Sequence, residues 1–124
     1  MVSNDAQKVF DEYYGFDDGV LKAFEYDFSD DGACSIRLEL YARNYNLEGN
    51  VWRDVEIWVR GVSEVRSTVI PVVINSKIKL VDLGGGLCLE VNGDFGLDSM
   101  SIENIRRYSF CYVIGRSVEI VECV

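Results

Sequence analysis

The chain of 124 residues carries a formal net charge of −9, four cysteines and no histidine. This length fits one domain, residues 1–124, whose core buries about two thirds of the surface of the unfolded chain. No apolar run approaches the ~18 residues of a membrane span, and the polar opening of the sequence is unlike a secretory leader. We therefore expect a cytoplasmic protein that binds neither membranes nor nucleic acids, because its charge repels anionic lipids and phosphates.

The charge is distributed unevenly along the chain. Residues 1–31 contain nine acidic and two basic residues, a net charge of −7, whereas residues 32–80 contain five acidic and seven basic residues, a net charge of +2. Residues 81–124, with seven acidic and three basic residues, return to −4. Because an acidic region speeds the encounter with a basic partner, this pattern predicts a basic protein as the partner. It does not indicate the oligomeric state.

The first element is a helix predicted over residues 5–14. Asn4 and Gln7 have the spacing of a capping box, and Gly15 is a typical residue to end a helix. Apolar side chains recur at the spacing of one helical face, at Ala6, Val9, Phe10, Tyr13 and Tyr14. A helix this short needs to dock on another element.

After the helix the apolar period changes from 3.6 to 2, which is typical of half-buried strands. In residues 22–28 the alternation places Phe24, Tyr26 and Phe28 on one face, which we expect to be the inner face. The Ser-Asp-Asp-Gly of residues 29–32 predicts a hairpin turn. Residues 34–42 and 51–62 continue the alternation, with Arg53 as the exception on an apolar face. Further strands are expected within residues 65–70, 72–83, 86–91, 109–114 and 117–123, and one or two helical turns in residues 101–108.

These elements together predict an α+β fold. The strands follow one another at short spacing, with no alternating helices that would build a parallel sheet. We expect a short N-terminal helix packed on a mostly antiparallel β-sheet, arranged as a β-meander, a sandwich or an open barrel.

The sequence lacks the residues of the common catalytic and metal sites. Without histidine it has neither the usual general base nor the usual partner of a serine or cysteine nucleophile. The stretch 27–32 is similar to the start of a calcium loop, but its twelfth position is Leu38 rather than glutamate. We therefore expect no catalytic residue, no cofactor and no metal. The cysteines form no CxxC pair and are expected to be buried free thiols: Cys34, Cys88, Cys111 and Cys123.

Two tryptophans and eight carboxylates are the candidate partner-binding residues. Trp52 and Trp58 share the outward parity of one strand with Asp54 and Glu56, and aromatic anchors among acids are typical of protein interfaces. Alternatively, the helix or a second sheet covers this face and buries both rings in the core. The remaining acids would attract and orient a basic partner, or would be only solvated side chains: Asp17, Asp18, Glu25, Asp27, Asp30 and Asp31.

A series of short motifs occupies residues 14–65. Residues 16–21 read Phe-Asp-Asp-Gly-Val-Leu and precede the strand FEYDF, a polar turn, IRLEL and VEIWVRGV. This order resembles a family of small bacterial immunity proteins encoded beside polymorphic toxins, in which a Phe-His-Asp opening leads into a β-meander with a phrase of the type l-x-F-x-G-V. Asp17 stands in place of the family's histidine, and Trp58 in place of its phenylalanine. The resemblance implies tight, non-catalytic neutralisation of a cognate toxin without a cofactor.

The leading hypothesis from the sequence is a non-catalytic protein-binding domain, an immunity protein that neutralises a basic bacterial toxin such as a nuclease. One alternative is an acidic housekeeping or structural interaction module. Another is a small carboxylate-based enzyme or a carbohydrate binder. Glycoside hydrolysis would require two acids at a fixed separation, which the sequence does not define.

Overall fold

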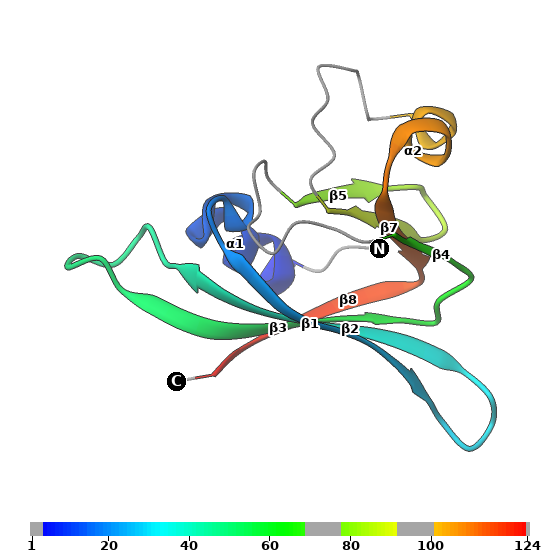
Figure 1. Ribbon diagram of the computed structural model, residues 1–124, viewed down its shortest axis with the longest axis horizontal. Coiled ribbons are helices and arrows are strands. Elements are labelled where there is room, and N and C mark those ends of the chain that lie inside the picture. Colours follow the sequence, from blue (N-terminus) through cyan, green and yellow to red (C-terminus); the bar gives the residue numbers. More distant parts are fainter. Residues whose placement is uncertain (1–3, 69–77, 92–100, 124) are drawn as a thin grey trace.

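The computed structural model describes residues 4–68, 78–91 and 101–123 (Figure 1). The described strands form two antiparallel sheets with the orders β1-β2-β3-β8, the first sheet, and β4-β7-β6-β5, the second sheet. This architecture confirms the predicted α+β class. The elements in chain order are α1 (Asn4–Glu12), the 3₁₀ turn η1 (Tyr14–Phe16), β1 (Val20–Phe28), β2 (Cys34–Arg43), β3 (Trp52–Arg60), β4 (Glu64–Ser67), β5 (Lys79–Asp82), β6 (Leu87–Glu90), α2 (Ile102–Tyr108), β7 (Cys111–Gly115) and β8 (Ser117–Cys123).

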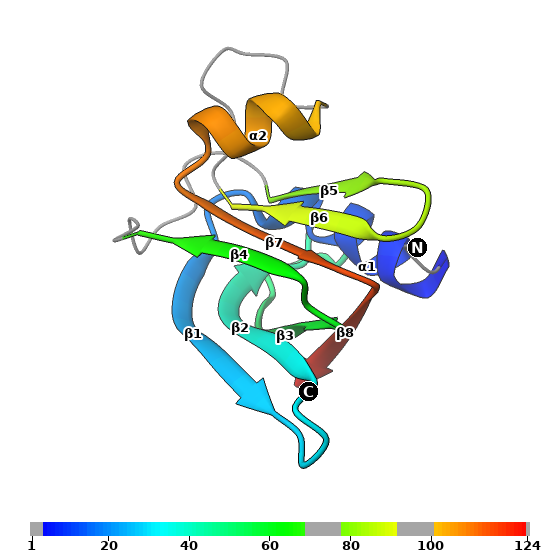
Figure 2. The same cartoon turned by 90° about the vertical axis from the view of Figure 1, so that its right-hand side faces the viewer.

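The two sheets are joined along one bent corner. The Arg116 N–H donates to the Arg60 carbonyl (2.8 Å) and the Ser63 N–H donates to the Ile114 carbonyl (2.9 Å). The antiparallel ladder therefore continues from the β3–β8 pair into the β4–β7 pair. Figure 2 shows the strands of the second sheet crossing those of the first. The result is two sheets that continue into each other at a bend, with β1 and β8 as the end strands of the first sheet and β4 and β5 as those of the second.

Glycine is required at this corner. A Cβ on Gly115 would lie 2.6 Å from Val59 Cγ1 and 2.8 Å from the Arg60 carbonyl oxygen, closer than atoms pack. Gly61, on the other strand of the corner, has a φ of +62°, in the left-handed region that glycine adopts most easily. Side chains at these positions would separate or strain the two strands where the chain passes between the sheets.

The core lies between the inner face of the first sheet, α1 and the second sheet. The inward parity predicted for residues 34–42 and 51–62 is confirmed by fully buried side chains of β2 and β3: Ile36, Leu38, Leu40, Ala42, Val55, Ile57 and Val59. Arg53, the predicted exception, pairs with Glu122 of β8 at 3.3 Å. Glu122 also accepts a hydrogen bond from the Tyr13 hydroxyl at 2.8 Å, so α1 and two strands share one polar cluster at the edge of the core.

The N-terminal helix ends at Glu12 rather than at residue 14. Tyr14, Gly15 and Phe16 have positive φ values of 51°, 64° and 62°, so the chain reverses here instead of completing another helical turn. Phe16 is buried, with its ring centroid 5.2 Å from that of Tyr13 and 5.1 Å from that of Phe10. The prediction that Tyr14 faces the core was wrong because Phe16 fills that place and Tyr14 is exposed.

The hairpin of β1 and β2 is confirmed, but the predicted burial of its first strand was wrong at two positions. Tyr26 is 52% exposed and Phe28 is 66% exposed, although both share the inner parity of the sheet. The end of the hairpin projects beyond the second sheet (Figures 1 and 2). No described element covers the inner face there, so alternation alone did not establish burial.

The remaining described elements agree with the sequence. The predicted helical turns form α2, which buries Ile105, and the five later strands overlap the predicted runs. Residues 69–77, which include the ends of two predicted runs, lie outside the described residues. Neither of the helices in the described ranges is long and apolar enough to cross a membrane.

A candidate protein-binding face

The first sheet has one face turned away from both α1 and the second sheet, which we call the outer face (Figure 1). Side chains at alternate positions of β1, β2, β3 and β8 form it. Six carboxylates against four basic groups leave this face a net charge of −2. The acids are Glu25, Asp27, Glu39, Asp54, Glu56 and Glu119, and the bases are Lys22, Arg37, Arg43 and Arg60.

Arg37 is the centre of the charges on the outer face. Its guanidinium bonds Glu56 through Nε, and its Nη atoms lie 3.3 Å from a Glu25 oxygen and 3.5 Å from a Glu39 oxygen. The hydrogen bond that Arg37 donates to the Glu56 carboxylate is the main reason why the pKa of Arg37 is raised. One cation thus holds three carboxylates of three neighbouring strands, and its side chain is only 18% exposed.

The two tryptophans lie on the outer face and are half-buried by their neighbours on that face. The alternative that the helix or the second sheet covers them was wrong. The Trp52 ring stacks on Tyr41 with centroids 5.5 Å apart, and its Nε1 donates to Asn50 at 3.2 Å. The Arg60 guanidinium lies 4.4 Å from the Trp58 ring centroid. Both rings are therefore held in place and present part of their surface for contact.

The structure divides the predicted acids into paired and unpaired groups. Glu25 and Glu56 bind Arg37, and Asp54 binds the Lys22 ammonium at 3.2 Å. In contrast, Asp17, Asp18, Asp27 and Asp30 form no ion pair with any described residue. Attraction of a basic partner therefore rests mainly on the unpaired group, because the charge of the paired acids is already compensated.

The predicted acids are also not all close together. Asp17 and Asp18 precede β1, whereas Asp30 and Asp31 follow it in the hairpin turn. The nine residues of β1 separate them by about 30 Å. This is more than twice the Debye length of about 8–10 Å at physiological ionic strength. The two ends of β1 therefore do not act as one acidic site.

Asp31 stabilises the hairpin turn. Its carboxylate accepts hydrogen bonds from the Ser29 hydroxyl and from the Ala33 N–H (3.0 Å), and the Ser29 hydroxyl is the main reason why the pKa of Asp31 is lowered. The Gly32 N–H donates to the Ser29 carbonyl at 2.9 Å, and Gly32 has a φ of +85°. Interpretation of this stretch as a turn is confirmed, and Asp31 is less available to a partner than Asp30.

Sequence reasoning missed an exposed aromatic row on the hairpin. The rings of Tyr26 and Phe28 are nearly parallel, with centroids 6.2 Å apart, and Phe24 lies 6.4 Å from Tyr26. Alternation predicted that these side chains share a face but did not show where the opposing layer ends. Their position immediately before the turn was the one available signal.

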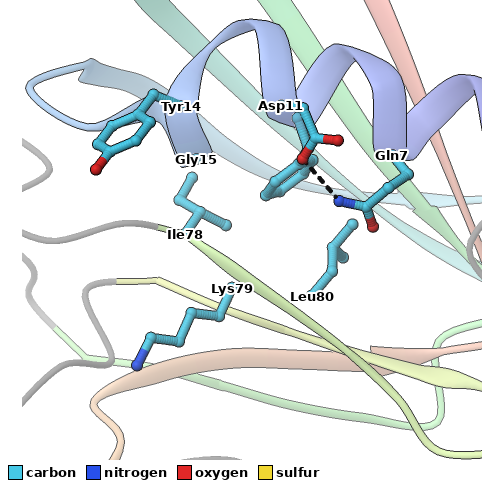
Figure 3. A pocket seen from close by; sticks show the side chains of 8 residues that line it. Gln7, Asp11, Tyr14, Gly15, Ile78, Lys79 and Leu80 are labelled. Atoms are coloured by element: carbon cyan, nitrogen blue, oxygen red, sulfur yellow. Dashed lines mark hydrogen bonds between the residues drawn. The ribbon is translucent and has the colours of Figure 1, made fainter.

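The described residues also form a cleft of about 490 Å³ between α1 and β5 (Figure 3). The Asp11 carboxylate there accepts a hydrogen bond from the Gln7 amide at 3.1 Å, and Lys79 lies across the cleft. Among the described residues that line it, Asp11 is the single carboxylate, so they supply no acid pair for glycoside hydrolysis.

All four cysteines are free thiols in the structure. Burial raises the pKa of Cys88 and of Cys111 to about 12, which makes both thiols poor nucleophiles at neutral pH. The prediction of burial is confirmed for Cys88 and Cys111, whereas Cys34 is only half-buried. It was wrong for Cys123, which is exposed on the outer face with its Sγ 4.0 Å from Glu56 Oε1. In the described ranges, no three histidine, cysteine or acidic side chains come together as metal ligands.

No protein-family model matches this sequence, and comparisons of the chain with curated proteins and with solved structures likewise give no match.

Proposed function

We propose that this protein is a non-catalytic binding domain, an immunity protein that neutralises a basic bacterial toxin such as a nuclease. The observation that carries the proposal is the combination of unpaired acids and half-exposed tryptophan on the outer face. Asp27 is unpaired among the described residues, and Glu25 of the same strand keeps a side chain that is 60% exposed. Trp58 lies on the same face, across Arg37 from Glu25.

The hairpin half of the outer face suits a basic surface better than the opposite half does. There the partner meets Asp27 and Asp30, which need no internal ion pair to be broken. At the opposite half, Asp54 is compensated by Lys22, and Trp52 is stacked on Tyr41 and bonded to Asn50. We place Trp58 as the anchor because tryptophan is enriched among the residues that dominate interface energetics, and because its ring, partly covered by the Arg60 guanidinium, lies in the hairpin half of the outer face.

The first experiment tests neutralisation. The polypeptide encoded directly upstream of this protein's own gene is expressed from an inducible promoter, with and without this protein. We expect growth arrest by the upstream product alone and normal growth on co-expression. Growth arrest that persists on co-expression, or an upstream product without any toxicity, would contradict the proposal.

The second experiment tests steering by charge. Replacing Asp27 and Asp30 with Asn removes two exposed, unpaired acids at the hairpin end of β1, whereas a control replaces the exposed acids Glu48 and Glu103 with Gln. Both variants change the net charge from −9 to −7. In stopped-flow measurements with the upstream product, we expect the first variant to associate about tenfold more slowly at low salt, and the difference to vanish at high salt. Equal association rates of the two variants would refute steering by the predicted acids.

The same measurements test the anchor. We expect Trp58→Ala to raise the dissociation rate about tenfold or more, and Trp52→Ala to raise it less, because dissociation reports the packed contacts of an interface. A larger effect at Trp52 would move the interface to the opposite half of the outer face.

A further inference from the structure

The outer edge of β1 is a second part of this surface that is suited to binding. In the first sheet, β1 pairs with β2 on one side, and no described strand pairs with its other side. The Ser29 N–H donates to the carbonyl of Ala33, which immediately precedes β2, so the backbone of Ser29 faces β2. Because bonding alternates along an antiparallel strand, Asp27 and Glu25 also bond toward β2, and the backbone groups of Phe24, Tyr26 and Phe28 point to the free edge.

This edge has few of the features that usually prevent strand addition. A β-bulge interrupts the register between Leu21 and Ala23, but from Ala23 to Phe28 the pairing with β2 is regular. Proteins commonly protect such an edge with lysine, proline or an irregular strand, and residues 23–28 include none of these. The exposed rings of Tyr26 and Phe28 instead add an apolar contact surface along the edge.

Charge determines which strand fits. An added strand would meet the carboxylates of Glu25 and Asp27 on the outer face and the rings of Phe24, Tyr26 and Phe28 on the inner face. Opposite charges directly across an antiparallel pair stabilise it, and like charges destabilise it. A strand that alternates basic with apolar residues therefore complements both faces at once.

The same charges disfavour a second copy of this chain. An antiparallel pair of two β1 strands centred on Glu25 places Glu25 opposite its own copy, and one centred on Asp27 does the same for Asp27. A pair centred on Tyr26 places Glu25 opposite Asp27 twice. Each of the three registers that overlap residues 24–28 most fully thus puts like charges directly opposite each other.

We propose that the free edge of β1 binds an extended segment of the basic partner, with basic and apolar residues in alternation, as an additional antiparallel strand. This inference rests on the proposed function for the source of the segment, and on the geometry of β1 for the mode of binding. Main-chain hydrogen bonds give such a contact its affinity, and the alternating side chains give it specificity.

The probe is an acetylated and amidated peptide of seven residues that alternates lysine and valine. Matched peptides replace lysine with glutamate, or carry N-methyl groups on alternate backbone nitrogens, which block strand pairing and keep the side chains. We expect the lysine peptide to bind and to slow amide hydrogen exchange of Phe24, Tyr26 and Phe28 about tenfold or more. The glutamate and N-methylated peptides should bind at least tenfold more weakly.

Two variants of the protein complete the test. Tyr26→Pro removes an N–H that β2 does not use, so it should abolish peptide binding. Asp27→Lys leaves the acid Glu25 beside one new base, so it should abolish the preference for the lysine peptide over the glutamate peptide. This variant keeps the test valid if the proline variant does not fold. Absence of binding at millimolar lysine peptide, or equal binding of the N-methylated peptide, would overturn strand addition. A dimer of the protein that protects the same amides from exchange in the absence of peptide would also overturn the proposal, because the edge would then bind a second copy of this chain.

The growth assay separates this inference from the proposed function. If Asp27→Lys abolishes the peptide preference but still neutralises the upstream product fully, the edge binds strands and the toxin is bound elsewhere, which overturns the assignment of the segment to the toxin. If the wild-type protein does not neutralise at all, the proposed function fails, and the peptide results alone decide whether the edge accepts a strand.

Discussion

Replacing Arg37 with Met tests whether the acidic outer face depends on one half-buried cation. The variant keeps most of the aliphatic volume and removes the guanidinium that holds Glu25, Glu39 and Glu56. The matched control is Lys22→Met, which removes one positive charge from the same face. Lys22 is 46% exposed and binds the single acid Asp54, so the two variants have equal net charge and differ in burial and in the number of partners.

The structure sets the size of the expected effect. An exposed ion pair contributes about 0.2–1 kcal/mol, whereas breaking a fully buried pair costs about 3–5 kcal/mol. Arg37 and Glu56 have 18% and 23% of their side chains exposed and therefore lie between these limits, whereas Glu25 is too exposed to contribute much. We expect Arg37→Met to lower the free energy of unfolding by about 1–2 kcal/mol, and Lys22→Met by at most about 0.5 kcal/mol.

Urea unfolding of the three proteins at pH 7 measures this difference. Equal stabilities of the Arg37 and Lys22 variants at pH 7 would refute the role of Arg37 as the shared counter-ion.

Two further predictions concern the fold beneath the outer face. Gly115→Ala should lower the free energy of unfolding in urea by about 1–3 kcal/mol, because the new Cβ would clash with Val59 and the Arg60 carbonyl. In the control Gly85→Ala, the Cβ has no atom within 4 Å, so this variant should be neutral or slightly stabilising. Equal effects of the two substitutions would contradict the packing of the corner. Burial, and then the bond to Glu122, raise the pKa of Tyr13, so the protonated hydroxyl stabilises the fold below the ordinary pKa of 10 and this contribution declines as pH rises above it. The stability difference between wild type and Tyr13→Phe, about 1 kcal/mol at pH 8, should therefore narrow at pH 11, and a constant difference would show that Tyr13 is not the titrating group.

The sequence predicted the fold class and most element positions because local rules operate within each element. Alternation placed Leu38 and Ile57 in the core correctly, and the turn chemistry of Ser29 and Asp31 placed the hairpin. What alternation could not define was the extent of the opposing layer. The inner parity of Phe28 is correct, but the second sheet ends before it reaches this ring.

The sequence predicted which residues lie on the outer face, but it did not predict the ion pairs between them. Parity correctly placed Trp52, Trp58, Asp54 and Glu56 on one face. That Arg37 compensates acids of two other strands depends on the register between strands, which the composition of a single strand does not define. Asp18 and Asp30 are far apart because the nine residues of β1 lie between them. This separation could be derived only after the structure showed that the two residues lie at opposite ends of one strand.

The division between paired and unpaired acids indicates which groups would set the association rate of a partner and which would set its affinity. A basic group that binds Glu56 competes with Arg37, so it exchanges one ion pair for another and adds little net free energy. Asp27 and Asp30 carry no such internal pair among the described residues, and their effect is mainly on the association rate. Affinity therefore has to come from contacts that form only on binding. Such contacts are offered by the Trp58 ring, by the exposed rings of Tyr26 and Phe28, and by the backbone edge of β1 with which no described strand pairs. Dissociation should therefore respond to Trp58 and Tyr26, whereas association responds to Asp27 and Asp30.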